Sequence, residues 1–255
     1  MNSKESANQL FHFTKKYENI VSIMNSGKFL PFFCIEDISF MYEERRNMVF
    51  AFPMVCFCDI PMERSSFHRV NYGNYGLGLT KEWGIKNNLN LVNYSFKESL
   101  KSASYRILVD YYTKKCINCE DDLNHNFKNA FSILLMTSKP YEGRKFNKSK
   151  RSWTNENFRF YDEREWRYLP LVDKLSWSIS LEDYDGDYDA LFNAIEIKQP
   201  KIQEEYALEF TVDDILYIFL QDKNETNTFL TDISVKYNDV EIRKITKIIT
   251  SPIDK

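Results

Sequence analysis

The chain of 255 residues carries 34 basic and 37 acidic side chains, a formal net charge of −3, and 16% of its residues are aromatic. With seven glycines and seven prolines, this composition excludes a disordered or collagen-like chain. The near balance of charge gives no strong overall field for nucleic acid, so a basic binding site has to be local. We expect a single domain spanning residues 1–255, because this length suffices to bury a core.

The N-terminus, MNSKESANQL, has no apolar stretch suited to a signal peptide, and no segment approaches the ~18 apolar residues of a membrane span. We therefore expect a cytoplasmic protein without membrane contact. The five cysteines are an odd number, which suits reduced thiols. Cys56-x-Cys58 and Cys116-x-x-Cys119 have zinc-ligand spacing, but the first pair lies in an apolar run where core packing is the better interpretation. We expect no metal.

The first predicted element is a short strand over residues 10–14, with His12 and Thr14 on its polar face. A lone histidine on a strand is more often structural than catalytic, although this polar face is also compatible with the wall of a cleft. A helix follows, with Thr14 as its N-cap and Gly27 as its end.

The next two predicted segments are β-prone, and one contains a proline while the other is rich in glycine. Residues 48–60 form an apolar, β-prone run that Pro53 divides. Residues 71–79, NYGNYGLGL, predict a turn that leads into a strand. The glycine spacing is not that of a dinucleotide fingerprint, but the glycines allow close backbone approach, and Tyr72 and Tyr75 are suited to contact a planar ligand. The alternative is a tight turn with surface tyrosines.

The middle of the chain, about 95–157, predicts an insertion that begins with two helices. Ser95-x-x-Glu98 has the pattern of a capping box, and it precedes an apolar stripe predicted to be buried: Phe96, Leu100, Ala103, Ile107 and Tyr111. A second helix is predicted over residues 123–136. The basic segment from Arg144 to Trp153 suits a contact with nucleic acid or another phosphate, although solvated loops often have this composition.

The last third of the chain is predicted to be mostly strands. Residues 161–168, YDEREWRY, predict a strand that places Glu163, Glu165 and Arg167 on one face. Further strands are predicted over 206–211, 215–220 and 240–249, with a short helix near 226–235. The fold class is therefore α+β, with a largely antiparallel sheet and a helical insertion.

The pair Glu163 and Glu165 is a candidate for acid–base chemistry, although the pattern is weak by itself. On one strand face the carboxylates lie within roughly 6–7 Å of each other, and neighbouring acids raise each other's pKa, which suits acid–base or electrostatic catalysis. Arg164 and Arg167 offer a second interpretation, in which the guanidiniums simply neutralise the acids.

The order of these motifs resembles a known family. His12-Phe-Thr14, MVCFCDIP, the H-x-x-x-YGNYGLGL segment and YDEREWR together resemble the AbiGi family of bacterial abortive-infection proteins, which are described as antitoxins of two-gene systems. The same layout is similar to the ADP-ribosyltransferase fold, whose core is a split antiparallel sheet. The resemblance implies a role in phage defence with a cognate toxin or antitoxin partner.

The wider resemblance also implies site residues and a co-substrate. His12 would bind the ribose of NAD, with Thr14 beside it, and Tyr72 or Tyr75, next to Gly76, would stack on the nicotinamide. Glu165 would stabilise the cation formed as nicotinamide leaves, and Glu163 would orient the acceptor. The alternative is a catalytically inactive transferase-like fold that binds a toxin or senses a phage component.

Overall fold

The computed structural model describes residues 8–42, 48–112, 114, 122–170 and 178–251. Its principal helices are α1 (Tyr17–Ser26), α2 (Ser65–Tyr72), α3 (Lys81–Lys86), α4 (Leu100–Tyr111), α5 (Asp122–Met136), α6 (Tyr188–Glu205), α7 (Thr226–Ile233) and α8 (Asp239–Ile248). Its longer strands are β1 (Gln9–Thr14), β3 (Phe32–Asp37), β4 (Val49–Cys58), β5 (Tyr75–Thr80), β9 (Gly143–Asn147), β10 (Ser152–Phe158), β11 (Glu165–Tyr168) and β14 (Ile215–Phe219).

Short strands complete the sheets: β2 (Lys28–Phe29), β6 (Asn90–Leu91), β7 (Asn93–Ser95), β8 (Ser138–Pro140), β12 (Ile179–Ser180), β13 (Leu208–Glu209) and β15 (Ile249–Thr250). The main sheet has the order β15-β14-β5-β1-β4-β11-β6 and is antiparallel except for the β14–β15 pair. The expected α+β class with a mostly antiparallel sheet is therefore confirmed.

Strand β4 joins two parts of the sheet. Its first half pairs with β3 and β12, whereas its last residues pair with β1 and β11. Pro53 lies at the boundary, opposite Phe33 of β3. The apolar run is therefore one continuous strand, and the proline marks the change of partners instead of an interruption.

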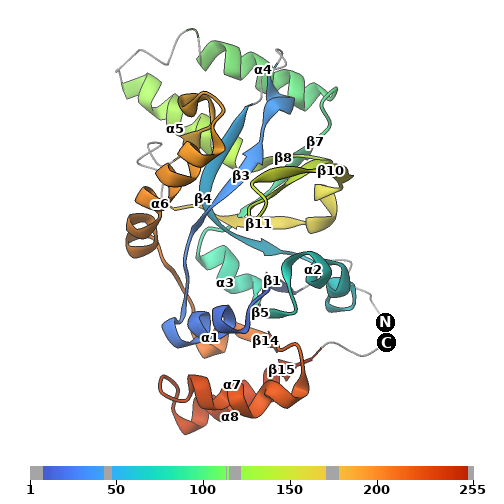
Figure 1. The fold of residues 1–255 in the computed structure, drawn as a ribbon, viewed down its shortest axis with the longest axis vertical. Coiled ribbons are helices and arrows are strands. Elements are labelled where there is room, and N and C mark those ends of the chain that lie inside the picture. The colour runs from blue at the N-terminus through green and yellow to red at the C-terminus, as the bar shows by residue number, and fades with distance from the viewer. Residues whose placement is uncertain (1–7, 43–47, 113, 115–121, 171–177, 252–255) are drawn as a thin grey trace.

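Helices cover the sheet in separate groups (Figure 1). Helices α1, α3, α7 and α8 pack on one apolar cluster, into which Ile20, Trp83, Phe229 and Ile245 are buried. The pair α4 and α5 forms a second cluster with β3 and β4 at the other end of the molecule. Helix α6 forms a third cluster against β3, β4 and β12.

The strand predicted over residues 240–249 is wrong, because this segment forms helix α8. Asn238 caps the helix through the backbone N–H groups of Val240 and Glu241, and the Glu241 side chain completes a capping box. Ile245 is fully buried, so helical packing overrides the β-propensity of the branched residues. Helix α6 likewise forms in a segment for which the sequence predicted no helix.

The capping box predicted at Ser95 is also wrong, because α4 begins after Ser99, whose side chain accepts from the Ser102 N–H. The helix buries Ser102, Tyr105 and Val109, which lie on the face opposite the predicted stripe. Leu100 and Ile107 of that stripe are 89% and 70% exposed. Helix α4 therefore presents an apolar stripe to solvent and packs through the face that carries Ser102, Tyr105 and Val109.

The segment from Gly143 to Phe158 forms a hairpin of β9 and β10 instead of a loop. The insertion is thus helical in its first half and β-structured in its second. In the described part of the chain, no helix has the length and apolar character needed to cross a membrane.

Candidate functional site: a cavity above a buried carboxylate cluster

A cavity of about 870 Å³ lies where β1, β3, β4 and β9 meet α2 and the turn before β11. Its wall contains carboxylates from several elements: Glu36, Asp37, Glu98, Glu142, Glu163 and Glu165. Cations border the same space: Lys97, Lys139, Arg144, Lys145 and Lys148. The two signs nearly balance, so any preference for a ligand charge has to arise locally.

Glu163 and Glu165 reach this cavity from a turn and a strand. Residues Phe160–Glu163 form a 3₁₀ turn, Arg164 has a left-handed backbone with φ of 43°, and β11 begins at Glu165. The strand predicted over 161–168 is therefore wrong in its first half. The left-handed residue reverses the chain locally, and both carboxylates still point to the same ammonium group.

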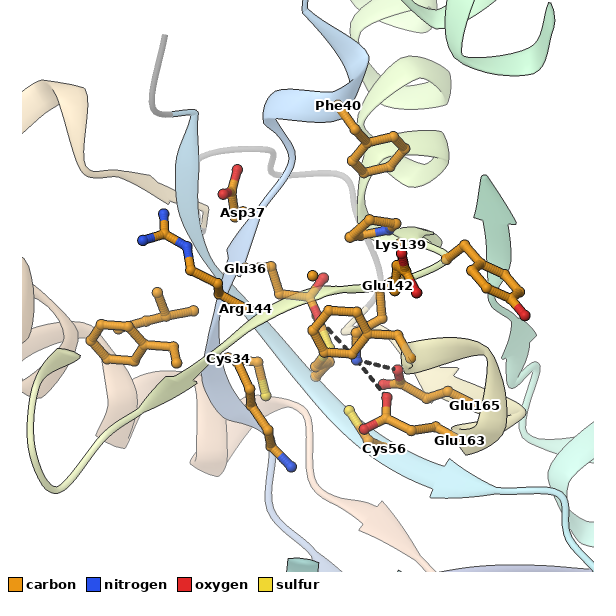
Figure 2. Close-up of a pocket in the computed structure, with 18 of the residues that line it drawn as sticks. Cys34, Glu36, Asp37, Phe40, Cys56, Lys139, Glu142, Arg144, Glu163 and Glu165 are labelled. Atoms are coloured by element: carbon orange, nitrogen blue, oxygen red, sulfur yellow. Dashed lines mark hydrogen bonds and ion pairs between the residues drawn. The ribbon is translucent and has the colours of Figure 1, made fainter. Parts of the chain in front are cut away.

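That ammonium belongs to Lys139 of β8. Its Nζ lies 2.7 Å from Glu163 Oε2, 3.0 Å from Glu165 Oε2 and 3.7 Å from Glu36 Oε1. Figure 2 shows the two neighbouring glutamates with Lys139 bonded to both. All four side chains are largely buried, so these charges interact strongly.

Arg167 is the second cation of the cluster and is completely buried. Its Nε lies 2.9 Å from Glu165 Oε1, and its two terminal nitrogens lie 2.5 and 2.9 Å from the carboxylate oxygens of Glu36. One of them also donates to the Met136 carbonyl at 2.5 Å. Register explains the first contact, because Glu165 and Arg167 share one face of β11.

These contacts fix the protonation state of Glu165. Burial alone raises the pKa of its carboxyl, but the charges of Arg167 and Lys139 outweigh burial and hold the pKa well below its usual range. Burial lowers the pKa of the Lys139 amine, and the surrounding glutamates raise it well above its usual value. Glu165 and Lys139 are therefore both charged at neutral pH, and each Glu165 oxygen is paired with a cation.

Tyr72, at the end of α2, extends the cluster into the cavity. Its hydroxyl donates to Glu163 Oε1, and the Nζ of Lys145 lies 3.7 Å from its ring centroid. Burial, followed by the charge of Glu163, raises the pKa of Tyr72 well above its usual value. Of the two tyrosines in NYGNYG, Tyr72 is thus the one that meets the carboxylates.

His12 borders the cavity, but its ring packs in the core. Phe11, the residue before it, shares a sheet face with Cys58 and Glu165, so His12 lies on the opposite face. Its ring centroid lies 5.0 Å from that of Phe29, and its Nδ1 donates to the Cys56 carbonyl at 3.0 Å. Burial lowers the pKa of this imidazole, partly offset by the bond to Cys56.

The remaining residues of the expected NAD site lie away from the carboxylates. Thr14 is buried, and its hydroxyl accepts from Asn19 at 2.7 Å. The Tyr75 hydroxyl donates to Glu225 at 2.8 Å, and Gly76 packs so closely that an added Cβ would lie 2.6 Å from the His12 carbonyl oxygen. The cavity has room for a dinucleotide, but the side chains brought together in it are those of Tyr72, Glu163 and Glu165.

The basic segment expected to contact nucleic acid is largely engaged within the protein. Trp153 donates to the Tyr188 hydroxyl at 2.7 Å, Arg151 pairs with Asp189, and Lys148 donates to the Phe33 carbonyl at 2.6 Å. A nucleic-acid contact here remains a prediction, and it would depend on exposed cations such as Arg144 and Lys150.

Cys56 and Cys58 are free thiols of β4, whereas Cys116 and Cys119 lie outside the described residues. Across the described ranges no group of three or more histidine, cysteine, aspartate or glutamate side chains has the arrangement of a metal site. The zinc interpretation therefore has no structural support in that part of the chain.

Three residues of the cluster were not identified as site residues from the sequence. Lys139 and Glu36 carry no local motif, since ion pairing across distant segments leaves no periodic signal. Arg167 has such a signal, because it follows Glu165 by two residues and the sequence already suggests that its guanidinium neutralises the acids.

An antiparallel α+β fold with a buried ionic cluster under a large cavity is typical of a domain that binds a ligand or catalyses a reaction. These features alone do not specify one activity. The family model described as "Putative abortive phage resistance protein AbiGi, antitoxin" matches residues 27–221, and the chain belongs to this family. The expected family is confirmed.

A curated relative is similar over most of both chains. The abortive phage resistance protein AbiGi of Lactococcus lactis subsp. cremoris is 27% identical over 206 residues, which cover 75% of this chain and 82% of the relative. No solved structure matches this chain. The comparisons thus support the family, whereas the ADP-ribosyltransferase likeness rests on the motif order.

Proposed function

We propose that this protein acts in phage defence as an antitoxin that binds its partner toxin and catalyses no reaction at the carboxylate cluster. The family description supports the antitoxin role. The observation that carries the absence of catalysis is the pairing of both Glu165 oxygens with Arg167 and Lys139. A carboxylate stabilises a developing cation only when its charge faces the reacting centre, and here two fixed cations already offset that charge.

Two measurements on one set of variants test this proposal. Purified wild-type protein incubated with NAD should release no nicotinamide above the buffer blank. Co-expression with the partner toxin should restore growth, and Glu163→Gln should restore it equally well. Glu98→Gln, which changes a carboxylate on the cavity wall outside the ionic cluster, is the matched control. Nicotinamide release that is lost in Glu163→Gln but kept in Glu98→Gln would disprove the non-catalytic proposal.

The second candidate is NAD-dependent ADP-ribosyl transfer, favoured by the convergence of Tyr72, Glu163 and Glu165 on one cavity. Bound NAD would supply the glycosidic bond that breaks. In this candidate Glu163 is the more available acid, since Lys139 and the Tyr72 hydroxyl hold it without a guanidinium. His12 and Thr14 would support the strand, and Tyr75 would not meet the nicotinamide.

The same assay separates the two candidates. Transfer predicts nicotinamide release together with labelling of an acceptor protein by a biotinylated NAD. Both signals should fall at least tenfold in Glu163→Gln, in line with the usual contribution of a positioned acid or base. Release without dependence on Glu163 would point to a contaminating hydrolase and count against this candidate.

A further inference from the structure

Lys145 of β9 is a partly buried cation to which neither candidate function above assigns a role. Its Nζ lies 3.7 Å from the ring centroid of Tyr72 and 4.8 Å from that of Phe158. Within the part of the chain that the structure describes, this ammonium has no carboxylate or hydrogen-bond acceptor as a partner. It faces the cavity with three N–H donors.

Two other lysines at this wall, Lys139 and Lys148, differ from Lys145 in this respect. Lys139 is surrounded by three glutamates, and Lys148 donates to a backbone carbonyl. Burial lowers the pKa of Lys145 to about 8; Glu163 opposes this change, while the ammonium groups of Lys139 and Lys15 add to it. A partly desolvated cation with cationic neighbours is destabilised, and an anion placed beside it would relieve that cost.

The adjacent carboxylate does not remove this preference. Glu163 is already paired with Lys139 at 2.7 Å and accepts the Tyr72 hydroxyl, so its charge is largely offset. The ammonium groups of Lys139 and Lys15 disfavour the charged form of Lys145, whereas Glu163 and Glu165 favour it. A phosphate offers more acceptor oxygens than a carboxylate to the three N–H donors of Lys145, so it is the better match for this ammonium.

A second feature of the same cavity indicates what such an anion would be attached to. The ring of Phe96 stacks on Tyr141 with centroids 4.4 Å apart, and Phe96 is still 57% exposed. Both residues border the cavity. An exposed aromatic face suits a nucleobase, because every base can stack on a ring.

We propose that the cavity binds a nucleotide, with Lys145 holding its phosphate and Phe96 stacking on its base. This site goes beyond the antitoxin role, because neutralisation of a toxin does not require it. Its loss would therefore leave growth rescue intact, and failure of growth rescue would leave the binding measurements unaffected.

Isothermal titration with ADP, and separately with inorganic phosphate, tests the proposal. Lys145→Met should weaken both ligands by roughly 10- to 100-fold, the range for a lost charge-assisted hydrogen bond. Lys145→Arg should keep most of the affinity. Phe96→Ala should weaken ADP but leave inorganic phosphate unchanged. Lys150→Met, at an exposed lysine of the same hairpin, is the matched control and should bind like wild type.

The pH dependence provides an independent readout. The free Lys145 amine loses its proton as pH rises through about 8, so ADP affinity should fall between pH 7.5 and 9.5. Lys145→Arg should show no such fall, because arginine stays charged. The proposal is overturned if wild type binds neither ligand, if Lys145→Met binds ADP normally, or if Phe96→Ala leaves ADP binding unchanged. Urea unfolding of each variant checks that the fold is retained.

Discussion

Arg167 of β11 and Glu36 of β3 form a two-pronged ion pair in which two guanidinium nitrogens lie 2.5 and 2.9 Å from the two carboxylate oxygens. The two residues are 131 positions apart in the sequence. The Arg167 side chain is completely buried, so water does not reach the guanidinium. Together with Lys139, it connects three strands beneath the cavity. The first prediction concerns this connection.

Replacing Arg167 with methionine should lower the free energy of unfolding by about 3–5 kcal/mol, because two buried carboxylates lose their main partner. The measurement is urea unfolding followed by circular dichroism. Arg243→Met is the control, because Arg243 is an exposed side chain of α8, and its effect should stay within about 0.5 kcal/mol. Equal stability of the two variants would contradict the buried cluster.

Stability should also fall in acid through Glu165. The folded pKa of this carboxyl lies below its usual range despite burial, owing to Arg167 and Lys139. The unfolded carboxyl has a pKa of about 4.3, so the contribution of Glu165 is fully present above that pH and is lost as pH falls below it. Urea midpoints measured from pH 7 to pH 3 should decline less steeply in Glu165→Gln than in wild type. Parallel curves would rule out this linkage.

The exposed stripe of α4 should tolerate polar residues. Ile107→Asp should change the free energy of unfolding by no more than about 0.5 kcal/mol, because the side chain is 70% exposed. Val109→Asp, two residues later on the buried face, should unfold the protein or cost more than about 4 kcal/mol. Thermal unfolding of both variants is the measurement. A severe loss of stability in Ile107→Asp would indicate that the apolar stripe of α4 is buried, as the sequence predicts.

Gly73 should be intolerant of a side chain. It has φ of 116° and ψ of 165°, and an added Cβ would lie 2.1 Å from the Thr14 carbonyl oxygen. Gly73→Ala should therefore destabilise by more than about 1 kcal/mol and displace Tyr72. Gly186 also has positive φ but open space around it, so Gly186→Ala should cost less. Equal costs would show that the close approach to Thr14 has no energetic weight.

Local pattern predicted those elements in which propensity and packing agree. The strand at residues 10–14, the helix that ends at Gly27 and the helix near residue 226 are confirmed. Gly27 ends its helix in a left-handed conformation with φ of 69°, which is what a glycine at that place predicts. In α8 the β-branched residues favoured a strand, although the Asn238–Glu241 capping box was present in the sequence as a helix signal.

The candidate site was predictable only where its residues are close in sequence. Glu163 and Glu165 do meet, but through a 3₁₀ turn that no alternation pattern indicates. Lys139 lies 24 residues before its partner Glu163, and Glu36 lies 131 residues before its partner Arg167. His12 was expected at the carboxylates, and a single strand does not reveal which of its faces will meet them.

Arg167 has a further consequence at the end of the helical insertion. Its guanidinium donates to the carbonyl of Met136, the last residue of the 15-residue helix α5. The C-terminal end of a helix carries partial negative charge, so this buried guanidinium acts as its cap. The helix end thus belongs to the same electrostatic unit as the three glutamates. Removing the Arg167 side chain would take a partner from the acids under the cavity and from the end of α5 at once. Strand β8, which carries Lys139, directly follows that helix end.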